Sequence, residues 1–320
     1  MKAIRVHEFG GPEQLKLDEI PTPKPAAGQV LVRVHAAGVN PYDTYMRAGT
    51  YAVKPPLPYT PGSDAAGIVE SVGEGVKKVK PGDRVYTAKT ITGAYAEYTL
   101  VLENQVQLLP AKISFPQGAA VFVPYATAYF ALHDSAQARA SETVLIHGAS
   151  GGVGTAATQM ARTMGLTVFG TAGSAKGLQL ALREGAHQVF DHGKQGYTDE
   201  IMKATAGRGF DVILEMLANV NLSADLKMLA TNGRVIVIGN RGEITINPRD
   251  IMLRRGAVRG FTLWAISEPE LTPIFAGIGA GLENGTLRPI IAKELHLKDA
   301  PKAHVDVLAS GASGKIVLTA

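Results

Sequence analysis

The sequence predicts an α/β protein of two domains, one rich in β-strands and one built on a parallel sheet wound on both faces by helices. Its 320 residues exceed what a single hydrophobic core usually contains. Short strand patterns separated by Gly and Pro fill the first part of the chain, and strand and helix patterns alternate through the middle. We predict segments at residues 1–124, 125–264 and 265–320, with the last segment returning to the first domain.

The first domain is predicted from strand periodicity. Val30, Val32 and Val34 alternate with other side chains at the two-residue period of a half-buried strand. Turn signals such as Pro81-Gly82-Asp83 separate the runs. Further strands are expected at residues 2–8, 65–72, 83–88 and 94–101. Many short strands with such turns indicate a compact, partly open β-barrel.

The second domain is predicted from alternating strands and helices. After a helical connector at 125–133, strands are expected at 143–147, 166–171, 188–190, 211–216, 234–239 and 258–263, with helices around 199–205 and 222–230. This alternation implies a parallel, doubly wound sheet with right-handed crossovers. In the tail we expect a helix at 268–284 and strands at 287–291 and 315–318.

The stretch from Thr143 to Ser174 carries the most specific motif. A short apolar run leads into a glycine turn at 148–154, and an apolar helical face and a second strand follow. Glycines allow close approach of the backbone, and a helix N-terminus offers N–H groups to a pyrophosphate. The stretch therefore predicts a Rossmann dinucleotide site. The alternative is a glycine-rich connection in another α/β unit.

A missing carboxylate predicts which dinucleotide binds. An NAD site places Asp or Glu near the end of the second strand, where it accepts the ribose hydroxyls. Residues 170–176 carry no carboxylate, and the next one along the chain is Glu184. Small hydroxyl residues followed by Lys176 tolerate or attract a 2′-phosphate, so NADPH is favoured over NADH. Lys176 has a second interpretation, as an ordinary solvated lysine at a helix start.

Composition excludes several classes of protein. The chain has no cysteine, which rules out disulfides, thiolate catalysis and cysteine-based zinc or iron–sulfur sites. No run reaches the length of a membrane-spanning helix and the N-terminus lacks a signal-peptide core, so we expect a cytoplasmic protein. The net charge of +4 permits RNA binding but does not argue for it, since no nucleic-acid motif accompanies the basic residues.

Five motifs together resemble one branch of the medium-chain dehydrogenase/reductase superfamily, the zeta-crystallin type of NADPH:quinone oxidoreductase. They are GVNPYDTYMRAGTY (38–51), LPYTPGSDAAGIVE (57–70), HGASGGVG (147–154), EMLANVNLSADL (215–226) and INPRD (246–250). The resemblance covers nearly the whole chain. It implies a GroES-like catalytic domain, a Rossmann domain that binds NADPH, and a cofactor lying in the cleft between the two.

The same alignment of motifs indicates chemistry without a metal. Zinc-dependent alcohol dehydrogenases of this superfamily carry a cysteine and a Gly-His-Glu run where this chain has Gly38-Val39-Asn40-Pro41 and Gly62-Ser63-Asp64. No two histidines form a ligand pair, the nearest being His187 and His192. Without a Lewis acid, an acceptor that takes hydride readily is favoured, such as a quinone or an activated alkene.

The resemblance places three candidate catalytic residues near the nicotinamide, namely Tyr45, Asn40 and Tyr51. Tyr45 lies on a segment, 42–47, that we expect to be helical, and its phenol suits hydrogen bonding or proton donation to a reduced quinone oxygen. The alternative is a core tyrosine. Asn40 either orients a carboxamide or quinone oxygen or sustains the turn before Pro41.

The resemblance also implies a set of cofactor contacts at strand ends, to which Lys176 is added. The set is Tyr45, Ser150, Gly151, Gly152, Val153, Gly173, Lys176, His192, Asn221, Ile238, Gly239, Asn240, Arg241, Phe261, Thr262 and Leu263. His192 has three interpretations. It stacks on adenine, it contacts the 2′-phosphate in its protonated form, or it is an ordinary histidine of a surface loop. The family often has a basic residue directly after this histidine, but here it is Gly193, so Lys176 or Lys194 is expected to hold the phosphate.

The leading hypothesis is metal-free reduction of quinones, of the ortho-quinone type, by NADPH. The enzyme alternatives are reduction of α,β-unsaturated ketones or aldehydes and of acyl thioesters. The resemblance also implies a non-enzyme alternative, a structural crystallin-like or RNA-binding role. We expect a homo-oligomer, a dimer or tetramer, in which the sixth-strand edge at 258–263 pairs across subunits.

Overall fold

The computed structural model describes residues 1–311 and 313–319, which form two compact units. Unit 1 comprises Met1–Val123, Pro289–Ala309 and Gly314–Ala320, and unit 2 comprises Pro124–Arg288 and Ser310–Ser313. Residues 312 and 320 of the predicted returning segment lie outside the described residues. Among the described helices, none combines the length and apolar character that crossing a membrane requires.

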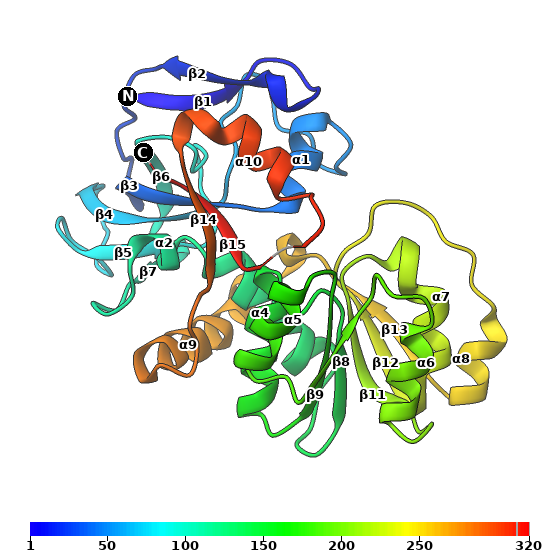
Figure 1. The fold of residues 1–320 in the computed structure, drawn as a ribbon. Helices are drawn as coiled ribbons and strands as arrows, with labels where there is room; N and C mark the ends of the chain where they lie inside the picture. The colour runs from blue at the N-terminus through cyan, green and yellow to red at the C-terminus, as the bar shows by residue number, and fades with distance from the viewer. Residues whose placement is uncertain (312, 320) are drawn as a thin grey trace. The chain divides into compact units, whose positions relative to one another are not determined.

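Unit 1 is a β domain, as predicted (Figure 1). Its seven-stranded sheet has the order β14 (Ile291–His296), β15 (Lys315–Thr319), β3 (Gln29–Val39), β4 (Asp64–Val72), β5 (Arg84–Thr87) and β7 (Val106–Leu108), and β6 (Tyr98–Leu102) also pairs with β3. A separate hairpin joins β1 (Lys2–Val6) and β2 (Leu15–Glu19). Three helices accompany the sheets, α1 (Pro41–Ala48), α2 (Phe115–Gly118) and α10 (Ala300–Asp306).

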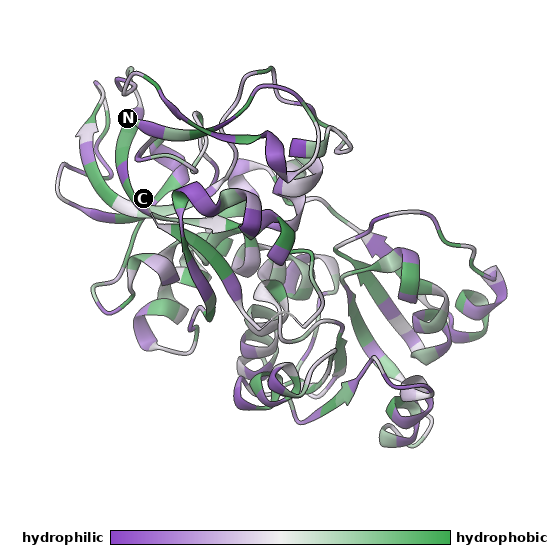
Figure 2. Ribbon diagram, turned by 45° about the horizontal axis from the view of Figure 1, so that its top comes forward, coloured by the Kyte–Doolittle hydropathy of each residue, from purple (hydrophilic) through white to green (hydrophobic). Residues whose placement is uncertain are grey.

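The long strand β3 organises the core of unit 1. Its first half packs Val30 and Val32 against the valines of β4, β5 and β6, and its second half packs Val34 and Val39 into a second cluster with β1, α10 and β15. Most of its side chains are buried, and the exposed Arg33 and partly exposed His35 interrupt the apolar pattern. Figure 2 shows hydrophobic stretches in the strands of this unit, interrupted by hydrophilic residues.

Unit 2 has the predicted Rossmann architecture, a six-stranded sheet that is parallel throughout (Figure 1). The order is β10 (Gln188–Asp191), β9 (Thr167–Ala172), β8 (Thr143–Ile146), β11 (Phe210–Glu215), β12 (Leu229–Val237) and β13 (Ala257–Gly260). The connecting helices are α4 (Gly152–Thr163), α5 (Ala175–Arg183), α6 (Tyr197–Ala204), α7 (Ala218–Met228) and α8 (Pro248–Arg254). Strand order reverses between β8 and β11, which is where ligands bind in such sheets.

The connector and the tail differ from the predicted segment boundaries. The connector is helical over Phe122–Ser135, in the order η3 (Phe122–Ala126), α3 (Thr127–Tyr129) and η4 (Phe130–Ser135), with π-type turns at both ends. The predicted tail helix is α9 (Glu268–Asn284), and it belongs to unit 2. A Cβ on Gly277 would touch the Tyr129 ring at 2.7 Å, so α9 packs on the connector. The chain therefore returns to unit 1 at Pro289 instead of residue 265.

Two predicted strands need correction. The strand predicted at 287–291 was wrong, because residues 287–290 close the C-terminus of α9 and β14 only begins at Ile291. Gly285 adopts a left-handed conformation, and the N–H groups of Gly285 and Leu287 both donate to the Gly281 carbonyl. The sixth strand predicted at 258–263 ends at Gly260; Phe261 and Thr262 follow it, and Leu263 begins a short 3-10 turn, η5 (Leu263–Ala265).

Candidate functional site

The glycine turn joins β8 to the N-terminus of α4, and the backbones of the turn and the helix are in close contact. Gly148 has a left-handed φ of +58°, which favours glycine. A Cβ on Gly154 would lie 2.2 Å from the Gly148 carbonyl oxygen, so α4 packs directly on the turn. The N-cap residue of α4 is Gly151, so its own side chain cannot cap the first-turn N–H groups. This geometry fits the pyrophosphate predicted for it.

The other residues of the turn lie around this helix start. Gly151, Gly152 and Val153 are partly exposed, whereas Ser150 is buried. A Cβ on Gly177 would come 2.8 Å from Ser150 Oγ, so the Ser150 hydroxyl lies beside the first turn of α5. The turn thus contacts the first turns of both α4 and α5.

The end of β9 carries no carboxylate, as the sequence indicated. Gly173 is exposed directly after the strand, and Ser174 caps α5 by accepting a hydrogen bond from the Gly177 N–H at 3.1 Å. Lys176 is exposed in the first turn of α5. Glu184 lies at the far end of α5, where it accepts a hydrogen bond from Gln159. A 2′-phosphate therefore meets no negative side chain in this segment.

His192 follows β10 directly and lies over Gly173. Its Nδ1 is 3.4 Å from Thr171 Oγ1, and a Cβ on Gly173 would be 2.7 Å from its Nε2. Burial lowers the pKa of His192, and the charge of His147 adds to the effect. The ring is therefore neutral near pH 7. The structure brings His192 and Gly173 together and disfavours a protonated His192 as the partner of the phosphate.

The remaining predicted cofactor residues lie at the same edge, because the carboxyl ends of parallel strands meet there. Ile238 and Gly239 follow β12 and donate their N–H groups to the Glu215 carbonyl. Asn221 lies within α7 and donates from Nδ2 to Glu215 Oε1 at 3.2 Å. Asn240 and Arg241 are exposed in the next loop, where Asn240 Nδ2 donates to the Gly242 carbonyl.

The three residues that follow β13 differ in their exposure to solvent. Thr262 is exposed, Leu263 is buried, and the Phe261 ring packs on Phe130 with ring centroids 4.8 Å apart. The side chain of Leu263 is therefore not available to a ligand.

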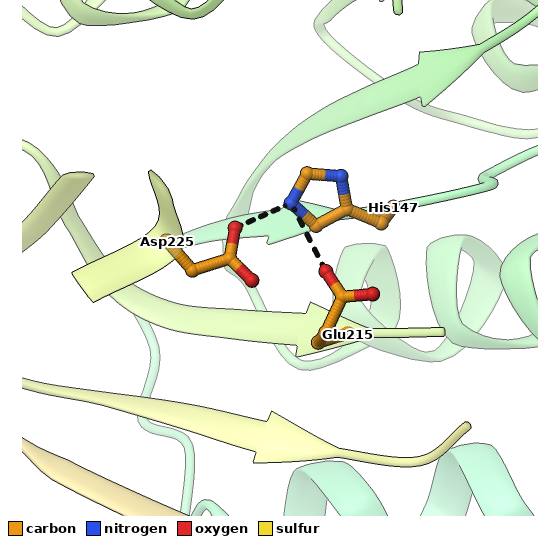
Figure 3. A group of neighbouring side chains, drawn as sticks. All are labelled: His147, Glu215 and Asp225. Atoms are coloured by element: carbon orange, nitrogen blue, oxygen red, sulfur yellow. Dashed lines mark hydrogen bonds and ion pairs between the residues drawn. The ribbon is translucent and has the colours of Figure 1, made fainter. Parts of the chain in front are cut away.

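A buried cluster of His147, Glu215 and Asp225 lies below the turn, and sequence reasoning missed it (Figure 3). His147 follows β8, Glu215 ends β11 and Asp225 lies on α7, so the cluster sits where the strand order reverses. His147 Nε2 is 2.8 Å from Asp225 Oδ1 and 3.5 Å from Glu215 Oε2. These are metal-ligand residue types within 4.8 Å of one another. The 2.8 Å separation is that of a charge-assisted hydrogen bond.

In unit 1 the candidate residue Asn40 belongs to a buried polar network. Asn40 is the N-cap of α1, and its backbone N–H donates to Asp43 Oδ2 at 2.9 Å. Its Nδ2 donates to Asp64 Oδ2 at 3.0 Å, and Lys315 Nζ donates to both Asn40 Oδ1 and Asp64. An ammonium only donates and a carboxylate only accepts, so these partners fix the amide orientation. Asn40 thus stands at the N-cap position of α1, with its side-chain amide held by Asp64 and Lys315.

A directed chain of hydrogen bonds ends on Asp43. Arg47 can only donate, so His304 Nδ1 accepts from it at 3.4 Å and the His304 proton lies on Nε2. His304 Nε2 is 3.3 Å from Tyr95 Oη, and Tyr95 donates to Asp43 Oδ2 at 3.1 Å. Burial lowers the pKa of His304 to about 3, with the Arg47 charge adding to it, and burial raises the pKa of Asp43 to about 7.

Tyr45 lies on α1, whose helical prediction is confirmed, and Tyr51 follows it. The Tyr45 carbonyl accepts hydrogen bonds from the N–H groups of Thr50 and Tyr51, and the Tyr51 ring lies 6.1 Å from that of Tyr42. A cavity of about 420 Å³ in unit 1 is lined by Tyr42, Asp43 and Met46 of α1. Of the described residues that line it, none is Asn40, Tyr45 or Tyr51.

Comparison with known proteins gives two family models and close relatives. The alcohol dehydrogenase GroES-like domain matches residues 26–111, and the zinc-binding dehydrogenase model matches residues 152–297. A human protein described as quinone oxidoreductase is 52% identical, over 99% of this chain and 97% of its own length. A solved structure of an Escherichia coli quinone oxidoreductase complexed with NADPH is 32% identical, covers 100% of both chains and has a TM-score of 0.90.

The fold extends beyond quinone reductases. A structure described as an NAD-dependent alcohol dehydrogenase has a TM-score of 0.93 at 29% identity and covers 100% of both chains. The backbone therefore does not distinguish NAD from NADP. On the identity and coverage of its relatives, the chain belongs to the quinone oxidoreductase family, in the zeta-crystallin-like branch of the medium-chain dehydrogenases/reductases.

Proposed function

We propose that this chain reduces quinones with NADPH as the electron donor. The observation that carries the proposal is the carboxyl edge of the unit 2 sheet, where a glycine turn at a helix N-terminus is followed by a strand end without a carboxylate. The human relative named quinone oxidoreductase and the Escherichia coli complex with NADPH support both halves of the statement.

The residues of unit 2 fit NADPH. The N–H groups at the start of α4 bind the pyrophosphate, and Gly154 holds that helix against the turn. Lys176 follows β9, Lys194 follows β10, and both are exposed. They supply positive charge for the 2′-phosphate. When bound, the cofactor supplies a hydride equivalent from its nicotinamide ring.

In unit 1 we assign the acceptor to Tyr45, Asn40 and Tyr51. Tyr45 donates a hydrogen bond from its phenol to a quinone oxygen, which becomes more basic as it is reduced. Asn40 retains one Nδ2 hydrogen beyond the one given to Asp64, and this hydrogen suits the second oxygen. The Lys315 and Asp64 contacts hold that amide rigid, so the donor is positioned before the acceptor binds.

Parallel assays of NADPH oxidation test this function. An ortho-quinone, an α,β-unsaturated ketone and an acyl thioester are compared as acceptors, and the quinone is expected to turn over fastest. The Tyr45→Phe variant keeps the ring and is expected to slow quinone turnover by about fivefold, the value of one neutral hydrogen bond. No NADPH-dependent turnover of any quinone would sink the proposal, and faster turnover of the ketone would replace quinones with enones.

We also propose a homo-oligomer formed along β13. This strand is an edge of the unit 2 sheet, and Val258, Arg259 and Gly260 are exposed on it. An exposed edge offers unpaired N–H and C=O groups to a second copy. Light scattering of the wild type and of a Val258→Lys variant tests this, because a charged side chain on an edge strand opposes pairing with a second copy. Unchanged mass in the variant would contradict it.

A further inference from the structure

Thr171 connects the buried cluster of unit 2 to His192. Its Oγ1 lies 3.4 Å from His147 Nδ1 on one side and 3.4 Å from His192 Nδ1 on the other. The Gly148 N–H, which can only donate, also points to this oxygen at 3.2 Å. The chain thus runs from Asp225 through His147 and Thr171 to His192, which is exposed at the surface.

The protons available to this run of hydrogen bonds allow only two arrangements of donors and acceptors. A hydroxyl has one proton to donate, and Thr171 already accepts from Gly148. Thr171 must therefore donate to one histidine and accept from the other. If His147 is an imidazolium, its Nε2 donates to Asp225 and its Nδ1 donates to Thr171. Thr171 then donates to His192 Nδ1, and the single proton of neutral His192 stays on Nε2.

Loss of one proton from His147 reverses the direction of the hydrogen bonds that Thr171 makes with the two histidines. Neutral His147 keeps its Nε2 proton on the side of ionised Asp225, so its Nδ1 becomes an acceptor for Thr171. His192 then donates from Nδ1, and its Nε2 becomes an acceptor. The charge of the buried cluster therefore decides whether the outer nitrogen of His192, beside Gly173, donates or accepts.

We propose that His147 is a positioning residue that acts through Thr171 to keep the His192 proton on Nε2, and that this donor favours the 2′-phosphate of NADPH over the free hydroxyl of NADH. A phosphate oxygen accepts hydrogen bonds and repels a ring nitrogen that presents a lone pair. This inference rests on the proposed function, because it concerns the cofactor that the function requires.

The surroundings of the cluster stabilise the arrangement with charged His147. Burial alone lowers the pKa of His147, but the charge and hydrogen bond of Asp225 and the charge of Glu215 outweigh it, so that pKa is raised. Burial and the charge of Asp225 raise the pKa of Glu215 to about 7, so Asp225, which is 2.8 Å from His147 Nε2, is the carboxylate that holds the His147 proton. Two other titratable groups face the chain, Tyr197 from α6 towards the carboxylates and Asp191 beside His192.

Two variants and a matched control test the inference in the full chain. Thr171→Val removes the hydroxyl, Thr171→Ser keeps it, and Asp225→Asn removes the charge that holds the His147 proton. Dissociation constants for NADPH and NADH are measured for each by calorimetry. Thr171→Val and Asp225→Asn are expected to weaken NADPH binding by about tenfold, the loss of one hydrogen bond to a charged group, and to leave NADH binding unchanged. Thr171→Ser is expected to match the wild type.

A spectroscopic readout identifies the tautomer directly. In ¹⁵N NMR spectra of the labelled protein, His192 is expected to carry its proton on Nε2 in the wild type and to lose that preference in Thr171→Val. A wild-type His192 protonated on Nδ1 would overturn the inference. So would equal loss of NADPH and NADH binding in Thr171→Val, since that result assigns Thr171 only to support of the Gly148 turn.

Different results overturn the role of His147 and the proposed function. A wild type that binds NADPH more tightly than NADH, with the same ratio in Thr171→Val and Asp225→Asn, overturns the role of His147 and leaves the proposed function intact. A wild type that binds no NADPH overturns both.

Discussion

Substitution of Gly154 by alanine should separate the packing of the glycine turn from its contact with the cofactor. The added Cβ would lie 2.2 Å from the Gly148 carbonyl oxygen and 2.6 Å from Ala149 Cα. Both atoms belong to the backbone, so relief requires α4 to move away from the turn by roughly 1 Å, a shift of the overpacking kind that costs about 1–3 kcal/mol.

Gly151→Ala is the matched control for this substitution. Its Cβ would have one near neighbour, the Gly148 carbonyl oxygen at 3.4 Å, and Gly151 has an extended φ of −77° that any residue adopts. We expect Gly151→Ala to melt with the wild type but to bind NADPH more weakly, because its methyl group occupies the approach to the helix N-terminus.

Calorimetric melting and NADPH titration of both variants check these expectations. For Gly154→Ala we expect the midpoint of the unit 2 transition to fall by roughly 5 °C, from about 2–4 °C per kcal/mol for a domain of this size. The reasoning is refuted if Gly154→Ala melts at the wild-type temperature, or if Gly151→Ala is the less stable of the two.

Further predictions concern unit 1. Lys315→Met leaves Asp64 buried without its cation and should lower the free energy of unfolding by about 3–5 kcal/mol in urea titrations, with part of the loss restored by adding Asp64→Asn. If the single variant unfolds like the wild type, the ion pair does not have this role. The folded state keeps His304 neutral to about pH 3, whereas the unfolded chain takes up its proton near the ordinary value. The stability from His304 is therefore complete above about pH 6.5 and lost as the pH falls, so from about pH 7 to pH 5 the wild type should lose about 2 kcal/mol more than His304→Gln. Parallel urea curves for the two proteins at both pH values would contradict this.

The glycine turn and the sheet could be predicted because their signals are local. A strand run, the glycines from Gly148 to Gly154 and a helical apolar face follow one another within a short stretch, and the structure places β8, α4 and β9 there. The missing carboxylate after β9 was likewise readable from adjacent residues. The ends of the later strands were placed to within a few residues, and parallel topology then brought them to one edge.

The buried polar clusters could not be predicted, because their members are distant in sequence. Asp64 and Lys315 are 251 positions apart, and His147 and Asp225 are 78 apart. Each residue alone is typical of an exposed surface, and only the folded chain pairs them. His147 was quoted within the turn motif and Asp225 within the motif after β11, but nothing in either motif indicated their contact.

The wrong strand at 287–291 has a different cause. Leu287, Ile290 and Ile291 carry the residue types of a strand, but Gly281 and Gly285 allow the chain to fold Leu287 back on α9. Tertiary packing at a helix end therefore overrode β-propensity. The same helix explains the late return to unit 1, since α9 packs on the connector before the chain crosses back.

The measurement that tests the central claim most directly is the initial rate at which the full chain oxidises NADPH and NADH, at equal concentrations, with one ortho-quinone as acceptor. The strand end without a carboxylate after β9 predicts that NADPH supports the faster rate, by about tenfold or more if one charged hydrogen bond is at stake. An equal or faster rate with NADH would contradict the cofactor assignment, and no quinone-dependent oxidation of either cofactor would contradict the function.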